Sequence, residues 1–146
     1  RAAQEAGCTL LVPTDGLAAK QFAAGAAHRA IANEDMAEGE MMLDVGPQSI
    51  KNAIALIDEA RTILWNGPMG AFEIAPFDTA TVAVARAVAE KTKSGQLVSV
   101  AGGGDTVAAL NVAGVAEEFS YLSLAGGAFL EWLEGKELPG VAALMK

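Results

Sequence analysis

The sequence predicts an α/β fold, in which helices flank a parallel sheet. Short β-prone apolar runs alternate with longer segments of helical spacing along most of the chain. Glycine-rich turns follow three of these runs, and the strand–helix–strand order favours parallel strands joined by right-handed crossovers. Ligands of such sheets bind beyond the carboxyl ends of the strands. The glycine turns are therefore the first candidates for a binding site.

Five short runs have the length and composition of buried strands. They are rich in large apolar residues, and turn residues bound them. The expected strands cover residues 9–12, 41–45, 62–65, 97–101 and 121–124. A turn at 13–16 is expected to close the first strand, whereas the alanine-rich residues 17–32 fit either a helix or an extended chain. The acidic residues between 33 and 40 are expected on a solvated loop.

Four further segments have helical character. Pro47 stands near the first helical position of the earliest one, where apolar residues then recur at the spacing of a single buried face. These residues are Ile50, Ala53, Ile54 and Ile57. The other helices are expected at 76–93, at 105–112, and from 126 to a stop near Gly135. No internal repeat or linker divides these elements.

The composition argues against several classes of function. A formal net charge of −8 disfavours nucleic acid and anionic membranes as partners, and no apolar run reaches the roughly 18 residues of a membrane-spanning helix. The chain has one cysteine, Cys8, and one histidine, His28, which argues against a disulfide framework, a zinc site and a Cys–His catalytic set. We expect Cys8 to be a buried, inert thiol in a protein of the cytoplasm.

The strongest candidate motif is Gly102-Gly103-Gly104-Asp105-Thr106, which lies between an expected strand and an expected helix. This order places free backbone N–H groups around an anion, and glycines let the backbone approach phosphate oxygens closely. Because a carboxylate repels phosphate, Asp105 fits such a site only with a divalent cation such as Mg²⁺ between them. The alternative is that Asp105 or Thr106 only caps the helix. The spacing fits neither a dinucleotide fingerprint nor a P-loop.

Two other glycine-bearing turns follow expected strands. Asn66, Gly67 and Pro68 form one of them, and the other opens the last expected helix. Glu73, a little beyond the first turn, could accept hydrogen bonds from ribose hydroxyls. An isolated glutamate is more often a solvated surface carboxylate, so both interpretations stay open for Glu73.

Four segments together resemble the phosphoglycerate kinase family. They occur in that family's order and at its spacing, and the resemblance covers almost the whole chain. The segments are L-D-V-G-P-Q-S at 43–49, W-N-G-P-M-G-A-F-E at 65–73, A-G-G-G-D-T at 101–106 and L-E-G-K-E-L-P-G-V at 133–141. The second and third segments are highly specific for the family.

The resemblance implies that residues 1–146 are the later part of a Rossmann-like, nucleotide-binding C-terminal domain in a two-domain kinase. In the family, the residue that matches Glu73 holds the ribose. Residues that match Gly103, Gly104, Asp105 and Thr106 lie at the nucleotide phosphates, with Asp105 on the Mg²⁺ side. The turn that matches Asn66, Gly67 and Pro68 lies beside the nucleotide.

The implied reaction is phosphoryl transfer between ATP and 3-phosphoglycerate in glycolysis, which gives 1,3-bisphosphoglycerate and ADP. The family's N-terminal domain, which binds 3-phosphoglycerate, has no counterpart in this sequence. The early part of the family's C-terminal domain, which carries a phosphate-binding lysine, has none either. We expect the intact enzyme to be a cytoplasmic monomer. Because the piece lacks these two parts, we expect it to be inactive alone. The alternative is a non-catalytic nucleotide-binding or structural α/β piece.

The last glycine turn departs from the family pattern. Where the family usually has Ser-Thr-Gly-Gly-Gly-Ala, this chain has Leu124 in place of the threonine and Ala125 in place of the first glycine. The family resemblance implies that Gly126 and Gly127 help to cradle the transferring phosphoryl group. Leu124 removes a hydroxyl and Ala125 adds a Cβ beside that cradle, so we expect the turnover rate to be affected.

Overall fold

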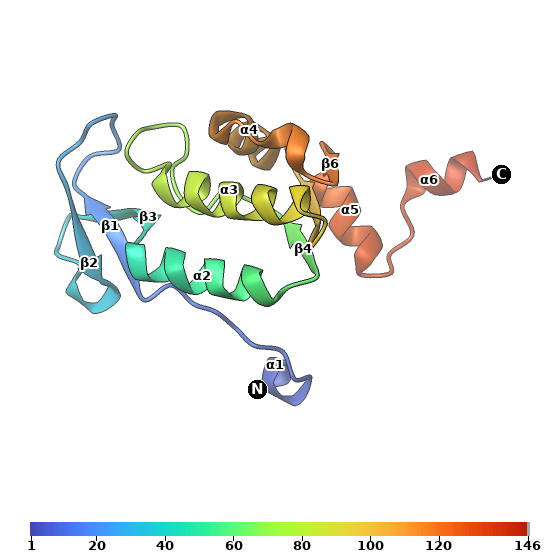
Figure 1. Cartoon of the computed structure of the whole chain (residues 1–146), viewed down its shortest axis with the longest axis horizontal. Helices are drawn as coiled ribbons and strands as arrows, with labels where there is room; N and C mark the ends of the chain where they lie inside the picture. Colours follow the sequence, from blue (N-terminus) through green and yellow to red (C-terminus); the bar gives the residue numbers. More distant parts are fainter. Residues whose placement is uncertain (146) are drawn as a thin grey trace. The chain divides into compact units, whose positions relative to one another are not determined.

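The computed structural model describes residues 1–145 (Figure 1). The chain divides into two compact units. The first unit comprises residues 1–59 and 69–84, and the second comprises residues 60–68 and, within the described residues, 85–145. Both units are therefore assembled from separate stretches of the chain. No linker in the sequence indicates this division.

The first unit contains an antiparallel sheet that the sequence did not predict. Its strands are β1 (Asp15–Ala19), β2 (His28–Ala32) and β3 (Met41–Val45), in the order β2-β1-β3. The alanine-rich residues 17–32, which fit either a helix or an extended chain, thus contain most of β1 and all of β2. The expectation of parallel strands throughout the chain is wrong for this unit, because both neighbours of β1 run antiparallel to it.

The expected strand at 9–12 is wrong, and so is the expected turn at 13–16. Residues 8–14 have no regular secondary structure, and the strand begins at Asp15. Leu10 and Val12 are 73% and 68% exposed, so this apolar run gains little burial within the described residues. In contrast, the alanines at the end of β1 are almost fully buried, because their small side chains let other segments pack closely over the strand.

Helix α2 (Pro47–Glu59) begins where the sequence predicts, with Pro47 as its first residue. Its first turn is capped from β1: the Asp15 carboxylate accepts hydrogen bonds from the backbone N–H groups of Gln48 at 2.8 Å and Ser49 at 2.7 Å. Burial alone would raise the pKa of Asp15, but hydrogen bonds from the Ser49 hydroxyl and these two amides hold it below its usual value. The Asp15 carboxylate therefore joins the sheet to the helix.

The second unit contains the predicted parallel sheet. Its strands are β4 (Thr62–Trp65), β5 (Val98–Gly102) and β6 (Tyr121–Ser123), in the order β4-β5-β6. Helix α4 (Gly104–Ala113) follows β5, and helix α5 (Gly126–Leu133) follows β6. The strand bounds agree with the sequence prediction to within one residue, which confirms the predicted α/β class.

Strand β5 lies at the centre of this sheet and carries a fully buried serine. The backbone N–H of Ser99 donates to the Ser120 hydroxyl, and the backbone N–H of Ser120 donates to the Ser99 hydroxyl, both at 3.1 Å. The Thr92 hydroxyl donates to the same Ser99 oxygen at 2.9 Å. Trp65 and Phe119 pack nearby, with ring centroids 6.2 Å apart. This packing fixes the strand on which the candidate site is built.

The remaining elements are short, apart from one long helix. Helix α3 (Thr79–Lys93) starts three residues later than expected, after a turn that includes Pro76. The short elements are α1 (Ala2–Glu5), the 3-10 helices η1 (Asn33–Asp35) and η2 (Ala116–Glu118), and α6 (Pro139–Leu144). The structure places Cys8 on the surface, so the expectation of a buried thiol is wrong. None of the helices within residues 1–145 has the length and apolar character needed to cross a bilayer.

Candidate functional site

Three turns meet at the carboxyl edge of the parallel sheet in the second unit. Because β4, β5 and β6 are parallel and adjacent, the segments that leave their carboxyl ends lie side by side. The backbone N–H of Gly67 donates to the Thr106 hydroxyl oxygen at 2.7 Å, and the backbone N–H of Gly103 donates to the Ser123 carbonyl at 2.9 Å. The structure thus brings together almost all of the predicted site residues: Asn66, Gly67, Pro68, Gly102, Gly103, Gly104, Asp105, Thr106, Gly126 and Gly127.

The turn after β5 presents the N-terminus of α4. Gly103 is the N-cap residue, with φ at +102°, and no side chain caps the helix. A φ in this region favours glycine. The amides of Gly104, Asp105 and Thr106 lie in the first helical turn, where backbone N–H groups have no acceptor within the helix. The arrangement offers several N–H donors and the positive end of a helix dipole to an anion.

The capping alternative for Asp105 and Thr106 is wrong. The Thr106 side chain is 2% exposed, and its oxygen accepts the hydrogen bond from Gly67 instead of capping α4. Thr106 therefore holds the neighbouring turn, which the Trp65 indole also supports by donating to the Gly67 carbonyl. The sequence contains no signal for the Gly67–Thr106 hydrogen bond, because it joins residues 39 positions apart.

The start of α5 packs directly against the glycine turn. A Cβ on Gly126 would lie 2.5 Å from the nitrogen and 2.7 Å from the Cα of Gly103, which is closer than real atoms approach. Gly127, the next residue, is exposed and has open space around the position of a Cβ. The two glycines therefore differ: Gly126 is required by packing, and Gly127 is not. The substituted neighbour Leu124 is 77% exposed.

Asp105 is the acidic member of this cluster. Its side chain is exposed in the first turn of α4, and no hydrogen bond or ion pair engages it within the described residues. Residues 1–145 contain no cluster of three or more His, Cys, Asp or Glu side chains that could hold a metal ion. Mg²⁺ is commonly bound by one or two carboxylates together with phosphate oxygens. Asp105 thus fits a cation that arrives with a phosphorylated ligand.

Glu73 is the one predicted site residue that belongs to the first unit. Its side chain is exposed, as both interpretations of the sequence require. The preceding residue, Phe72, is buried, and the backbone N–H of Ala71 donates to the Leu43 carbonyl of β3 at 2.8 Å. A short anchored segment therefore presents the Glu73 carboxylate to solvent.

Asp44, in β3, is a residue that the sequence analysis missed. It is 2% exposed, and its carboxylate oxygens accept hydrogen bonds from the backbone N–H groups of Val45 and Ala80, each at 2.9 Å. Burial raises the pKa of Asp44 to about 6 despite these two hydrogen bonds, and the nearby charge of Asp78 adds to the rise. The sequence does give one sign of Asp44, because it is an acidic residue within an otherwise apolar expected strand.

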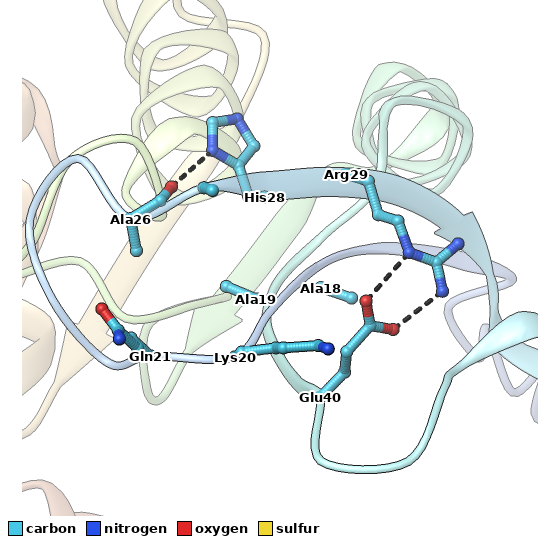
Figure 2. A pocket seen from close by; sticks show the side chains of 9 residues that line it. Ala18, Ala19, Lys20, Gln21, Ala26, His28, Arg29 and Glu40 are labelled. Atoms are coloured by element: carbon cyan, nitrogen blue, oxygen red, sulfur yellow. Dashed lines mark hydrogen bonds and ion pairs between the residues drawn. The ribbon is translucent and has the colours of Figure 1, made fainter.

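The first unit also carries an open cavity of about 400 Å³ beside β1 and β2. Figure 2 shows that Arg29 points to Glu40 and that His28 points to the Ala26 carbonyl. The guanidinium donates to both Glu40 oxygens, at 2.9 and 2.8 Å, and lowers the pKa of Glu40 to about 2. The loop acid Glu40 is therefore paired rather than simply solvated, and the Arg29 charge is balanced within the cavity.

Known proteins resemble the chain closely. The family model described as phosphoglycerate kinase matches residues 1–136. A phosphoglycerate kinase from Methylorubrum populi is 62% identical over 143 residues, which are 98% of this chain and 36% of that protein. The solved phosphoglycerate kinase from Coxiella burnetii has a TM-score of 0.89 and 40% identity, over 99% of this chain and 36% of that one. The corresponding structure from Pyrococcus horikoshii OT3 has a TM-score of 0.75 and 28% identity, over 92% and 32%.

The two glycines at the start of α5 provide a matched test of the packing. Gly126→Ala should lower the free energy of unfolding by about 1–3 kcal/mol, because the new Cβ overlaps the Gly103 backbone. Gly127→Ala should cause no loss and a gain of up to about 1 kcal/mol, because the position is helical and open. Urea unfolding of the two variants measures this difference. Equal stabilities would contradict the close approach.

Asp44 should give the protein a distinctive dependence of stability on pH. Its pKa lies near 6 in the folded state and near 3.8 when unfolded, so its contribution is fully present below pH 3.8 and is lost as pH rises through 6. The free energy of unfolding of the wild type relative to Asp44→Asn should fall by up to about 3 kcal/mol between pH 4 and 7. Urea unfolding of both proteins across this range checks the sign, and a flat difference would show that the carboxyl is not buried.

Proposed function

Because the chain belongs to the phosphoglycerate kinase family, we propose that it is the later part of that enzyme's C-terminal, nucleotide-binding domain. The chain spans about a third of the length of the relatives that it matches, 36% for the protein from Methylorubrum populi. The proposed reaction of the whole protein is reversible phosphoryl transfer between ATP and 3-phosphoglycerate, with ADP and 1,3-bisphosphoglycerate as products. The whole protein would act as a monomer in the cytoplasm.

The observation that carries this proposal is the meeting of three glycine turns at one edge of the parallel sheet. The first-turn amides of α4 would bind the nucleotide phosphates. Asp105 would hold Mg²⁺ together with phosphate oxygens, and the bound ion would neutralise charge on the phosphates. The chain is acidic as a whole, with a net charge of −8. Phosphate binding would therefore depend on local amides and the cation rather than on the general field of the protein.

The start of α5 would support the transfer itself. Phosphoryl transfer requires little covalent chemistry from the protein and depends on in-line positioning and on donors around the equatorial oxygens. The amides of Gly126 and Gly127 have no acceptor within their helix and would supply part of those donors. Ala125 narrows the choice of backbone conformations just before them. The proposed role of Glu73, in the other unit, is to accept hydrogen bonds from the ribose hydroxyls.

Further parts of the proposed active site would come from outside these 146 residues. None of the lysines lies in the three glycine turns, so the cationic groups that phosphoryl transfer requires must be supplied by other segments. The domain that binds 3-phosphoglycerate would likewise be separate. The chain alone is therefore proposed to be inactive.

The role of Asp105 can be tested in the full-length protein. Asp105→Asn should lower kcat/KM for the Mg²⁺ complex of ATP by about 100-fold, because a carboxylate that holds the cation is lost. Calorimetric titration with ADP should show that Mg²⁺ tightens binding to the wild type and no longer does so for the variant. Glu117→Gln, another exposed acid of the same unit, is the control and should behave as the wild type. Unchanged Mg²⁺ dependence in Asp105→Asn would refute the assignment and favour a non-catalytic role for the turn.

A further inference from the structure

We infer that Asp44 is a positioning residue, whose carboxylate contacts both ends of the segment 70–80 and thereby fixes Glu73 for the ribose of the nucleotide. This inference rests on the proposed function, because Glu73 receives its role there. All of the residues involved belong to the first unit. Asp44 itself would not touch the nucleotide.

The first end of the segment lies against the Asp44 carboxylate. A Cβ on Gly70 would overlap the Oδ1 atom of Asp44 and would come within 2.7 Å of the Phe77 carbonyl oxygen. Only a residue without a side chain therefore brings the backbone this close to the carboxylate. The next backbone N–H, that of Ala71, donates to the Leu43 carbonyl at 2.8 Å, so the segment is hydrogen-bonded to the strand that carries Asp44.

The second end of the segment is the N-terminus of α3. The other Asp44 oxygen, Oδ2, accepts the backbone N–H of Ala80 at 2.9 Å. The neighbouring Thr81 is fully buried, and its hydroxyl oxygen accepts the backbone N–H of Met69 at 3.0 Å, which joins the helix to the start of the segment as well. One carboxylate thus contacts both ends of a loop, and a second hydrogen bond closes the loop beside it.

Between its ends the segment is internally braced. The backbone N–H of Phe72 donates to Gly70, that of Ile74 to Ala71 and that of Phe77 to Ile74, at 2.8 to 3.1 Å. The two phenylalanines are 8% and 0% exposed, so the loop is anchored on both sides of Glu73. Because the loop is short and internally hydrogen-bonded, we expect a displacement of its backbone at either end to move the Glu73 carboxylate.

The chemistry of the position favours this role over simple packing. A carboxylate offers two acceptor oxygens, and Asp44 uses them in two directions, toward Val45 and toward Ala80. An amide would offer only one acceptor oxygen. The buried charge is also a cost to stability, as the raised pKa of Asp44 indicates. A charged group at position 44 is explained if the geometry of segment 70–80 is needed for nucleotide binding.

The test uses steady-state kinetics of the full-length enzyme with ATP and with 2′,3′-dideoxy-ATP, which lacks both ribose hydroxyls. Asp44→Asn should raise KM for ATP about tenfold and change kcat by less than about threefold, because alignment of a charge-assisted hydrogen bond is lost. The same substitution should leave KM for dideoxy-ATP unchanged. In a Glu73→Gln background it should add less than about twofold, since the two residues act on one contact.

Two further variants keep the test decisive. Ser49→Ala removes the hydrogen bonds of a buried serine elsewhere in the unit, and it should lower stability without changing KM. If Asp44→Asn does not fold, Thr81→Val releases the same segment at Met69 and should show the same loss with ATP alone. The inference would be overturned if Asp44→Asn left KM for ATP unchanged or raised KM equally for ATP and dideoxy-ATP. It would also be overturned if Asp44→Asn raised KM for ATP as much in the Glu73→Gln background as in the wild type.

The Glu73→Gln variant separates this inference from the proposed function. If Glu73→Gln leaves KM for ATP unchanged, the proposed ribose contact is wrong, and the role of Asp44 is wrong with it. If Glu73→Gln raises KM and Asp44→Asn does not, only the positioning role is overturned.

Discussion

The candidate site depends on the close approach of two backbones at the carboxyl edge of the parallel sheet. Gly126, at the start of α5, lies against Gly103 with no room for a side chain. This contact places the N-termini of α4 and α5 next to each other. The first-turn amides of each helix have no acceptor within that helix. The positive ends of both helix dipoles would favour a bound polyanion at this place. The packing therefore supports the proposed phosphate site.

A second principle of the structure is the use of buried or half-buried carboxylates as acceptors for backbone amides of other elements. Asp15 caps α2 from β1, and Asp44 caps α3 from β3. The two carboxylates respond differently: hydrogen bonds lower the pKa of Asp15, whereas deeper burial raises that of Asp44. Both carboxylates thereby fix the start of a helix whose first turn lies in the first unit.

The sequence predicts the second unit well and the first unit poorly, for a physical reason. Strands β4, β5 and β6 are short, mainly apolar runs that glycine-bearing turns follow, as is typical of parallel strands, so they are recognisable locally. Strand β1 contains aspartate, glycine and alanine, which have low strand propensity. It is extended because both neighbouring strands pair with it. The apolar run at 9–12 has the opposite character, since it resembles a strand but has no partner strand in the described residues.

The same distinction holds for the candidate site. The glycine turns are predictable because each is a local requirement of the backbone, and the resemblance of their motifs to a known family added roles for Glu73 and Asp105. The hydrogen bonds that hold these turns and the Glu73 loop in place are not predictable, because they join residues far apart in the sequence. The Gly67–Thr106 hydrogen bond spans 39 positions and the Ala80–Asp44 hydrogen bond spans 36.

If the glycine turns form the phosphate end of a nucleotide site, as proposed, ADP should perturb their backbone amides. An amide NMR titration of ¹⁵N-glycine-labelled full-length protein with ADP, with and without Mg²⁺, tests this expectation most directly. We expect shifts of the amide resonances of Gly103, Gly104, Gly126 and Gly127 that grow when Mg²⁺ is present. The resonances of Gly95 and Gly114, which lie at other turns, should not move. A well-dispersed spectrum in which ADP moves none of the first four, or moves all glycines alike, would contradict the proposal.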